Sequence, residues 1–133
     1  MITHWTTYNG IAYAKTISDL RVSLNKAGKF EINARAVHAL GNPDAVELLF
    51  DEVNKRIGLR PADPEQPNAH PLIVHSPGAG RRLYAARFLR RFGINNSLTV
   101  IFTQPYINAE GILVLDLKKT IEIQPRKRYT MGL

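Results

Sequence analysis

Arginine is unusually concentrated in one short part of this sequence. Five arginines fall within eleven residues, and they are Arg81, Arg82, Arg87, Arg90 and Arg91. A guanidinium group presents a planar fork of donors that fits phosphate oxygens and the edge of guanine. A dense set of such groups is typical of a surface that contacts phosphates. The pattern therefore predicts a polyanion-binding surface in the second half of the chain.

The charge of the whole chain supports this prediction because it is divided unevenly. Residues 1–66 contain eight Lys/Arg and eight Asp/Glu, whereas residues 67–133 contain ten and three, so the formal charge of +7 lies in the second half. Such an asymmetry indicates a polyanionic partner. The alternative is a basic surface that only keeps the protein soluble and has no specific partner.

Residues that could perform catalysis or bind a metal do not form a recognisable motif. The four histidines are His4, His38, His70 and His75, and their spacing does not match His-Glu-x-x-His. The sequence also has no glycine-rich phosphate loop followed by Lys-Ser/Thr. It therefore predicts a protein that is not an enzyme and that uses neither a metal nor a cofactor.

An internal repeat indicates which elements must position the arginines. Residues 22–50 align without a gap with residues 74–102, at an offset of 52, and the alignment contains seven identities. The identities are Val22/Val74, Ala27/Ala79, Gly28/Gly80, Ala34/Ala86, Arg35/Arg87, Gly41/Gly93 and Phe50/Phe102. Matched glycines enclose matched apolar positions, so we interpret residues 20–60 and 72–117 as two copies of one structural unit.

The first copy is expected to contain strands around one short helix. Leu20–Asn25 alternates apolar and polar residues, as a half-buried strand does. After a turn at Gly28 and a short strand, a helix ends near Leu40, with Gly41 as its C′ residue. Ala45–Phe50 is expected to be the next strand, and Asn54–Pro61 is expected to turn the chain into another strand.

The helix of the second copy has an apolar side and a basic side. Its expected apolar stripe is Tyr84, Ala85, Phe88, Leu89 and Phe92. Arg87, Arg90 and Arg91 share the opposite side, which is either part of the polyanion surface or only the solvated face of the helix. Arg35 and Arg87, which repeat, could each instead hold a structural ion pair across a local twofold.

The two copies are expected to form one domain over residues 1–133. Between them, Pro61–Pro71 has four prolines in eleven residues, so it is expected to be a stiff connector that is neither helix nor central strand. Residues 124–133 are predicted to be a basic tail. The aromatic residues that precede the first copy, and that could add a strand or cover one end of the domain, are Trp5, Tyr8 and Tyr13.

Several features predict a cytoplasmic protein that does not enter a membrane. No run approaches the roughly 20 apolar residues that a membrane helix needs. The first ten residues lack the basic-then-apolar pattern of a signal peptide. The chain has no cysteine, so it contains no disulfide, and a reducing compartment fits it more easily.

The repeated motif resembles the AbrB-type swapped-hairpin domain of bacterial transition-state regulators and MazE-like antitoxins. The family motif has a Gly-Arg pair, a short strand, a helix and Leu-Gly, with thirteen residues from the first glycine to the last. Gly28–Gly41 and Gly80–Gly93 keep that spacing, with Lys29 and Arg81 in the place of the family's arginine. The family usually opens the helix with proline, whereas this sequence has Asn33, which can cap a helix, and Ala85, which cannot.

The resemblance implies both a fold and a partner. Family members carry one copy and pair as dimers to close a barrel, whereas this chain holds both copies. It therefore implies a mainly β fold with two short helices, a pseudo-twofold cradle-loop barrel similar to the double-psi barrel of two ββαβ halves. It also implies DNA binding by Lys29 and Arg81, with Arg21, Lys26 and Arg82 nearby.

The combined prediction is a DNA-binding protein, a transcriptional regulator or accessory factor that contacts double-stranded DNA with its basic turns and second helix. The predicted contact residues are Lys26, Lys29, Arg81, Arg82, Arg87, Arg90 and Arg91. One alternative is a protein-interaction or assembly module, antitoxin-like, that docks through its neutral first half and does not bind nucleic acid. Another is an enzyme on a double-psi-like barrel, since fold does not decide function. A homodimer is compatible with DNA binding and with protein interaction, because a duplicated unit can pair within or between chains.

Overall fold

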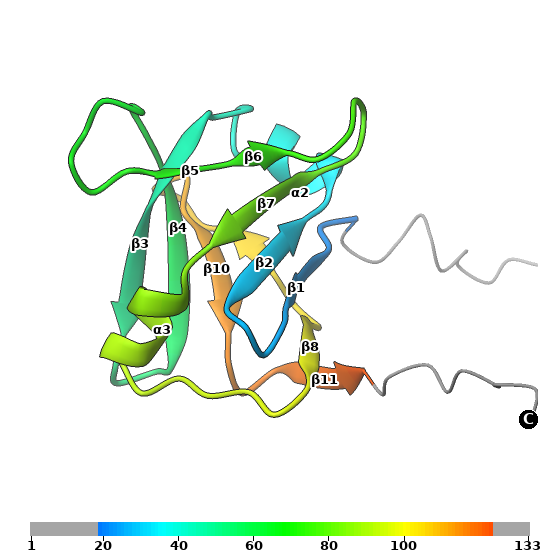
Figure 1. The fold of residues 1–133 in the computed structure, drawn as a ribbon, viewed down its shortest axis with the longest axis vertical. Helices are drawn as coiled ribbons and strands as arrows, with labels where there is room; N and C mark the ends of the chain where they lie inside the picture. Colours follow the sequence, from blue (N-terminus) through cyan, green and yellow to red (C-terminus); the bar gives the residue numbers. More distant parts are fainter. Residues whose placement is uncertain (1–18, 124–133) are drawn as a thin grey trace, which may run out of the picture.

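The computed structural model describes residues 19–123, which form two antiparallel β-sheets and two short helices (Figure 1). The predicted tail at 124–133 and the aromatic residues Trp5, Tyr8 and Tyr13 lie outside the described residues. The prediction of a mainly β fold with two short helices is confirmed. Neither helix in the described range has the length or the apolar run that crossing a bilayer requires.

The first sheet has six strands in the order β11-β8-β1-β2-β7-β6. Their bounds in this order are Thr120–Ile123, Thr99–Phe102, Val22–Leu24, Lys29–Ile32, Arg81–Tyr84 and Ile73–Val74. The second sheet has five strands in the order β5-β3-β4-β10-β9. Their bounds are His70–Pro71, Ala45–Asp51, Arg56–Ala62, Leu113–Asp116 and Tyr106–Ile107. The described strands do not close into a single hydrogen-bonded barrel.

The core lies between the two sheets, and in strands such as β1 and β2 alternate residues point into it. The six-stranded sheet contributes Val22, Leu24 and Phe30, and the five-stranded sheet contributes Ile57 and Leu113, all completely buried. The ring of Phe30 stacks on that of Phe102 from β8, with 6.4 Å between the centroids. The core therefore combines residues from both copies of the repeat.

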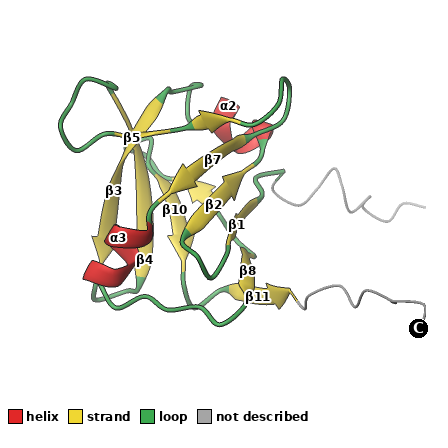
Figure 2. Cartoon of the chain, in the orientation of Figure 1, coloured by secondary structure: helices red, strands yellow, loops and turns green. Residues whose placement is uncertain are grey.

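The structure repeats at the offset that the sequence indicates. Helix α2 is Ala34–Ala39 and helix α3 is Ala86–Arg91, so α2 and α3 are separated by 52 residues, as are β2 and β7. In the β2–β7 pair, Lys29 lies opposite Tyr84 and Ile32 lies opposite Arg81. Arg81 is the counterpart of Lys29, and Tyr84 is the counterpart of Ile32. Exchanging the two copies therefore leaves the pairing unchanged, as a local twofold axis requires. Figure 2 shows α2 and α3 at opposite ends of this strand pair.

Both helices end in the same way. Gly41 has a φ of 89°, and the N–H of Asn42 donates to the carbonyl of Val37. In the second copy Gly93 has a φ of 66°, and the N–H of Ile94 donates to the carbonyl of Leu89. This is the Schellman arrangement, in which a left-handed residue lets the chain turn away from the helix axis. The predicted role of Gly41 is confirmed.

The two helices begin differently, as the sequence predicts. The side chain of Asn33 accepts hydrogen bonds from the N–H groups of Ala36 and Arg21, both at 3.0 Å, and donates to the carbonyl of Asp19 at 2.7 Å. Ala85 stands at the equivalent position and makes no side-chain cap. Only the first helix therefore has a side chain that ties it to the chain entering β1.

Replacing Asn33 with alanine is expected to lower the free energy of unfolding by about 1–2 kcal/mol, because the cap and both tethers are lost. Chemical denaturation followed by far-UV circular dichroism measures this loss. Asn33→Ser, which keeps an acceptor for the cap, is the control and is expected to recover about half of it. Equal losses for the two variants would show that the cap itself contributes nothing.

The structure differs from the sequence-based prediction in the bounds of the connector and in the place of Tyr84. Pro61 and Ala62 continue β4, and His70–Pro71 form an edge strand, so only residues 63–69 form a connecting loop. Proline fits at position 61 because β10 pairs with β4 only as far as Leu59, so β4 is an edge there. Tyr84 is not on the helix but is the last residue of β7, where it points outward and is 56% exposed.

Candidate nucleic-acid interface

The structure divides the seven predicted contact residues among four positions. Lys29 and Arg82 lie on the outer face of the six-stranded sheet, and Arg81 begins β7. Lys26 lies in the exposed turn between β1 and β2. The three arginines of α3 point to solvent, and they are Arg87, Arg90 and Arg91.

The two basic residues on the outer sheet face share one carboxylate. Glu31 lies directly opposite Arg82 in the β2–β7 pair. A carboxylate oxygen of Glu31 is 3.5 Å from Nζ of Lys29 and 3.3 Å from Nε of Arg82. This carboxylate offsets part of both positive charges, so Lys29 and Arg82 are less suited to contact phosphate than the sequence suggests.

Arg81 is turned toward the loop that precedes it. Its Nη1 donates long hydrogen bonds to the carbonyls of Gly80 at 3.3 Å and Ala79 at 3.5 Å. Contacts of this length are weak. They place the guanidinium beside its own backbone at the β6–β7 end of the sheet, apart from the helix arginines.

Helix α3 presents its arginines on a firmly packed base. Leu89 is buried, and the rings of Phe88 and Phe92 contact the ring of Phe50 from β3, with centroid distances of 6.4 and 4.9 Å. The predicted division into an apolar and a basic side is confirmed for these residues. Packing of this kind holds a six-residue helix that is too short to be stable alone.

None of the three α3 arginines, nor Lys26, forms an ion pair within residues 19–123. The ion pairs found there are Lys29–Glu31, Arg82–Glu31, Arg35–Asp19, Arg56–Asp116 and Arg60–Glu47. Arg35 therefore pairs next to its own copy, and the expected ion pair of Arg87 across the twofold is not among them. We call Lys26, Arg87, Arg90 and Arg91 the basic helix face.

The carboxylates with lowered pKa belong to the five-stranded sheet. The hydrogen bond from Arg60 lowers the pKa of Glu47, and the hydrogen bonds from Asn54 lower that of Asp51. Burial raises the pKa of Asp116, but hydrogen bonds and charges from Lys118 and Arg56 outweigh it, so the pKa lies below its usual value. These acids are committed to local structure and do not line the basic helix face.

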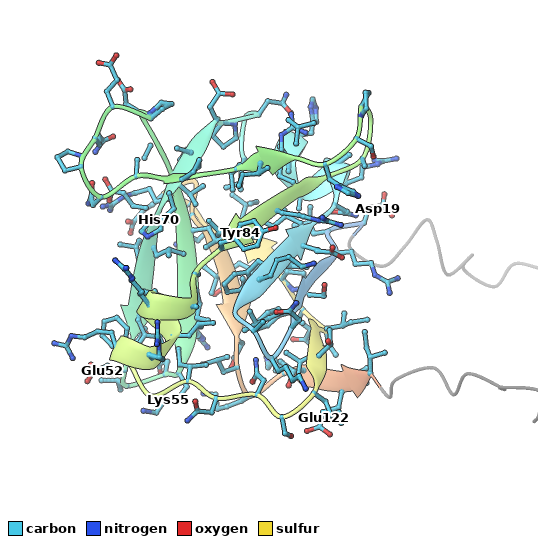
Figure 3. All side chains as sticks on the ribbon, in the orientation of Figure 1. Asp19, Glu52, Lys55, His70, Tyr84 and Glu122 are labelled. Atoms are coloured by element: carbon cyan, nitrogen blue, oxygen red, sulfur yellow. The ribbon has the colours of Figure 1, made fainter. Side chains whose placement is uncertain are left out.

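Lys55 is a basic residue that the sequence did not single out. It lies at the tip of the β3–β4 hairpin beside α3, together with Glu52 (Figure 3). Its Nζ is 6.0 Å from the centroid of the Phe50 ring. In the sequence, the turn at Asn54-Lys55 after Phe50 was the feature that indicated an exposed position for Lys55. Because Asp51 and Glu52 are on the same tip, Lys55 adds little net positive charge there.

A hollow of about 350 Å³ joins the β1–β2 turn to α3. It brings Lys26 and Arg90 together, although they are separated by 64 positions in the sequence. No aspartate or glutamate lines it. We call it the basic hollow, and its lining is Asn25, Lys26, Ala27, Gly28, Ala86, Leu89, Arg90, Ile94, Asn95 and Asn96.

A second hollow of about 350 Å³ lies beside the β6–β7 loop of the other copy, and only Ala79 and Gly80 of its lining are counterparts of residues in the basic hollow. It extends from the β6–β7 loop over residues of β1, β2 and β7 to Asn33, the cap of α2. Its lining includes Arg21, His75 and Arg82, and also Glu31. We call it the mixed hollow, because it contains a carboxylate.

The protein was compared with protein-family models, with curated proteins and with solved structures, and none of the three comparisons gave a match.

Proposed function

We propose that this protein binds double-stranded DNA through the basic helix face, as a transcriptional regulator or an accessory DNA-binding factor. The observation that carries the proposal is that five of the seven predicted contact residues, the four of the basic helix face and Arg81, have no carboxylate partner within residues 19–123. Uncompensated, exposed arginines are the groups that gain most from phosphate contacts, because binding releases the counterions condensed on DNA.

The position of these charges supports the proposal. Arg87, Arg90 and Arg91 follow the spacing i, i+3 and i+4, so they share one side of α3. Lys26 and Arg90 line the same hollow, so the β1–β2 turn extends this side. The chemistry would be phosphate neutralisation first, with the guanidinium forks available to guanine edges. A cysteine-free chain also suits a reducing compartment.

The proposal differs from the family resemblance in where the contacts lie. The resemblance implies the Gly-basic turns, but Lys29 pairs with Glu31, and Arg81 turns to its own loop. The symmetric register of β2 and β7 supports a pseudo-twofold relation to cradle-loop and double-psi barrels, in a more open form. We therefore keep the family's partner and assign its binding to α3 and Lys26.

Salt dependence tests the proposal directly. Fluorescence anisotropy with a duplex of about 30 base pairs, or three helical turns, would be recorded between about 50 and 200 mM salt. If about six phosphates are contacted, log affinity is expected to fall with log salt with a slope of about −5. The matching single strand is the control for duplex preference. A flat salt response, or no binding at the lowest salt, would contradict the proposal.

A second function is favoured by one feature of the six-stranded sheet. Its edge strand β11 exposes Ile121 by 61% and Ile123 by 39%, next to the partly exposed Ile101 of β8. Apolar side chains on an open edge strand are suited to pairing with another protein or with a second copy of this chain. Light scattering across a concentration series distinguishes this function, since Ile121→Lys would abolish any dimer without changing DNA affinity.

A further inference from the structure

The basic hollow is held in shape by backbone contacts between the two copies. The carbonyl of Gly28 accepts a hydrogen bond of 2.9 Å from the N–H of Ala85. Gly28 has a φ of 92°, and a Cβ on it would lie only 2.7 Å from Cα of Ala86. The turn that carries Lys26 is thus fixed directly against the start of the helix that carries Arg90.

The turn itself is also fixed from within. The N–H of Asn25 donates to the carbonyl of Lys29, and the N–H of Lys29 donates to Oδ1 of Asn25 at 2.9 Å. Since Oδ1 is the acceptor there, the amino end of the same carboxamide remains as a donor. The turn therefore holds Asn25 and the backbone that carries Lys26 in place without a ligand.

The opposite side of the hollow follows from the way α3 ends. Gly93 turns the chain, and the bond from the N–H of Ile94 to the carbonyl of Leu89 sends residues 94–96 back along the helix. This places Asn95 and Asn96 on the rim. The chain from α3 to β8 runs below the β1–β2 turn in Figure 1.

The lining of the hollow has the chemistry of a phosphate site. Lys26 and Arg90 supply positive charge, and three asparagines supply carboxamide donors. Ammonium, guanidinium and amide donors together satisfy the several acceptor oxygens of a phosphate. The volume of about 350 Å³ is within the range of sites that hold small ligands.

The mixed hollow provides an internal comparison. It has a similar volume and also lies beside a Gly-basic turn, but Glu31 lines it, and this carboxylate already pairs with Arg82. A phosphate there would meet a negative charge and would have to displace an ion pair. Of the two hollows beside the Gly-basic turns, only the basic hollow has no carboxylate in its lining and suits an anion.

We infer that the basic hollow seats a phosphate group, with Lys26 and Arg90 as its charged ligands and Asn25, Asn95 and Asn96 as its neutral donors. The choice of phosphate over other anions rests on the proposed function. Two sources share this chemistry, which are the backbone of duplex DNA and a free nucleotide.

The test is an NMR titration of the whole chain labelled with ¹⁵N. Inorganic phosphate, adenosine monophosphate and the duplex are added separately, and the backbone amide signals are followed. We expect saturable shifts at Lys26, Gly28, Asn95 and Asn96, with no shift at Gly80 in the mixed hollow. Stronger binding by the duplex identifies the DNA backbone as the source, and stronger binding by the monophosphate identifies a nucleotide.

Two matched variants complete the test. Lys26→Ala/Arg90→Ala is expected to weaken phosphate binding about tenfold or more, because two charge-assisted contacts are lost. Arg21→Ala/Arg82→Ala, which removes the same charge from the mixed hollow, is expected to leave it within about twofold. The dispersion of the amide spectrum shows whether each variant is folded.

The outcomes separate this inference from the proposed function. Duplex binding without shifts at the basic hollow would overturn the phosphate site and leave the DNA-binding proposal standing. Absence of duplex binding would overturn the proposed function. The titration with inorganic phosphate and adenosine monophosphate would then show by itself whether the basic hollow binds phosphate. Equal effects of the two variants would show only a general response to charge and would overturn the inference.

Discussion

Replacing the three α3 arginines with glutamine is expected to lower the affinity for duplex DNA about 100-fold at low salt. The variant Arg87→Gln/Arg90→Gln/Arg91→Gln removes the unpaired charges of the basic helix face but keeps long side chains that favour helix. Each lost phosphate contact also lowers the magnitude of the salt slope by about 1, so a slope near −5 should become about −2. Anisotropy titrations at several salt concentrations measure both quantities.

A second triple variant separates position from charge. Lys29→Gln/Arg81→Gln/Arg82→Gln lowers the net charge by the same amount but changes residues that already contact Glu31 or their own loop. We expect it to weaken binding less than about tenfold. If the two variants are equally weak, the contacts are spread over the whole basic half. If the second variant is the weaker one, the family's Gly-basic turns carry the binding and our assignment to α3 is wrong.

Replacing Gly80 with alanine is expected to lower the free energy of unfolding by about 4 kcal/mol or more, and so to unfold much of the protein. A Cβ at this position would overlap the carbonyl oxygen of Ile32 and would lie 2.7 Å from Cα of Asn33. Both are backbone atoms at the junction of β2 and α2, so no flexible side chain can move aside. Urea denaturation and the melting temperature report the loss.

Alanine variants at Gly28 and Gly41 distinguish the cost of a steric clash from the cost of backbone strain. Their φ values are 92° and 89°, so alanine is similarly strained at both positions, but only Gly28 has a neighbour within 4 Å. We expect Gly41→Ala to cost about 1 kcal/mol and Gly28→Ala to cost about 2–3 kcal/mol more. Similar values for these two variants would show that the two copies tolerate separation at this point.

Much of the local structure could be predicted from the sequence because it depends on near neighbours. Asn33 as a cap and Gly41 as a C′ residue follow from side-chain chemistry and φ within one turn of chain. The repeat located both helices and the strand before each of them. The outward position of Tyr84 was missed because helical periodicity also fits it, and only its pairing with Lys29 shows that the strand continues.

The candidate site was predictable in composition but not in arrangement. The sequence identified every member of the basic helix face among seven residues. It could not show that Glu31, opposite Arg82, would pair with two of the others, because strand register is a long-range property. Likewise, Lys26 and Arg90 come together only because the first turn packs on the second helix.

The symmetric β2–β7 pair also has a consequence for the time at which the protein folds during its synthesis. Strand β2 has no β7 to pair with until residue 84 has been made, and β1 lacks β8 until residue 102. At about 5–20 residues per second, the apolar side of β2, with Phe30 and Ile32, stays uncovered for several seconds on the ribosome. The hairpins β1–β2 and β3–β4 can form earlier, but the six-stranded sheet closes only when β7 and β8 have been made, so folding should be slow for a protein of this length.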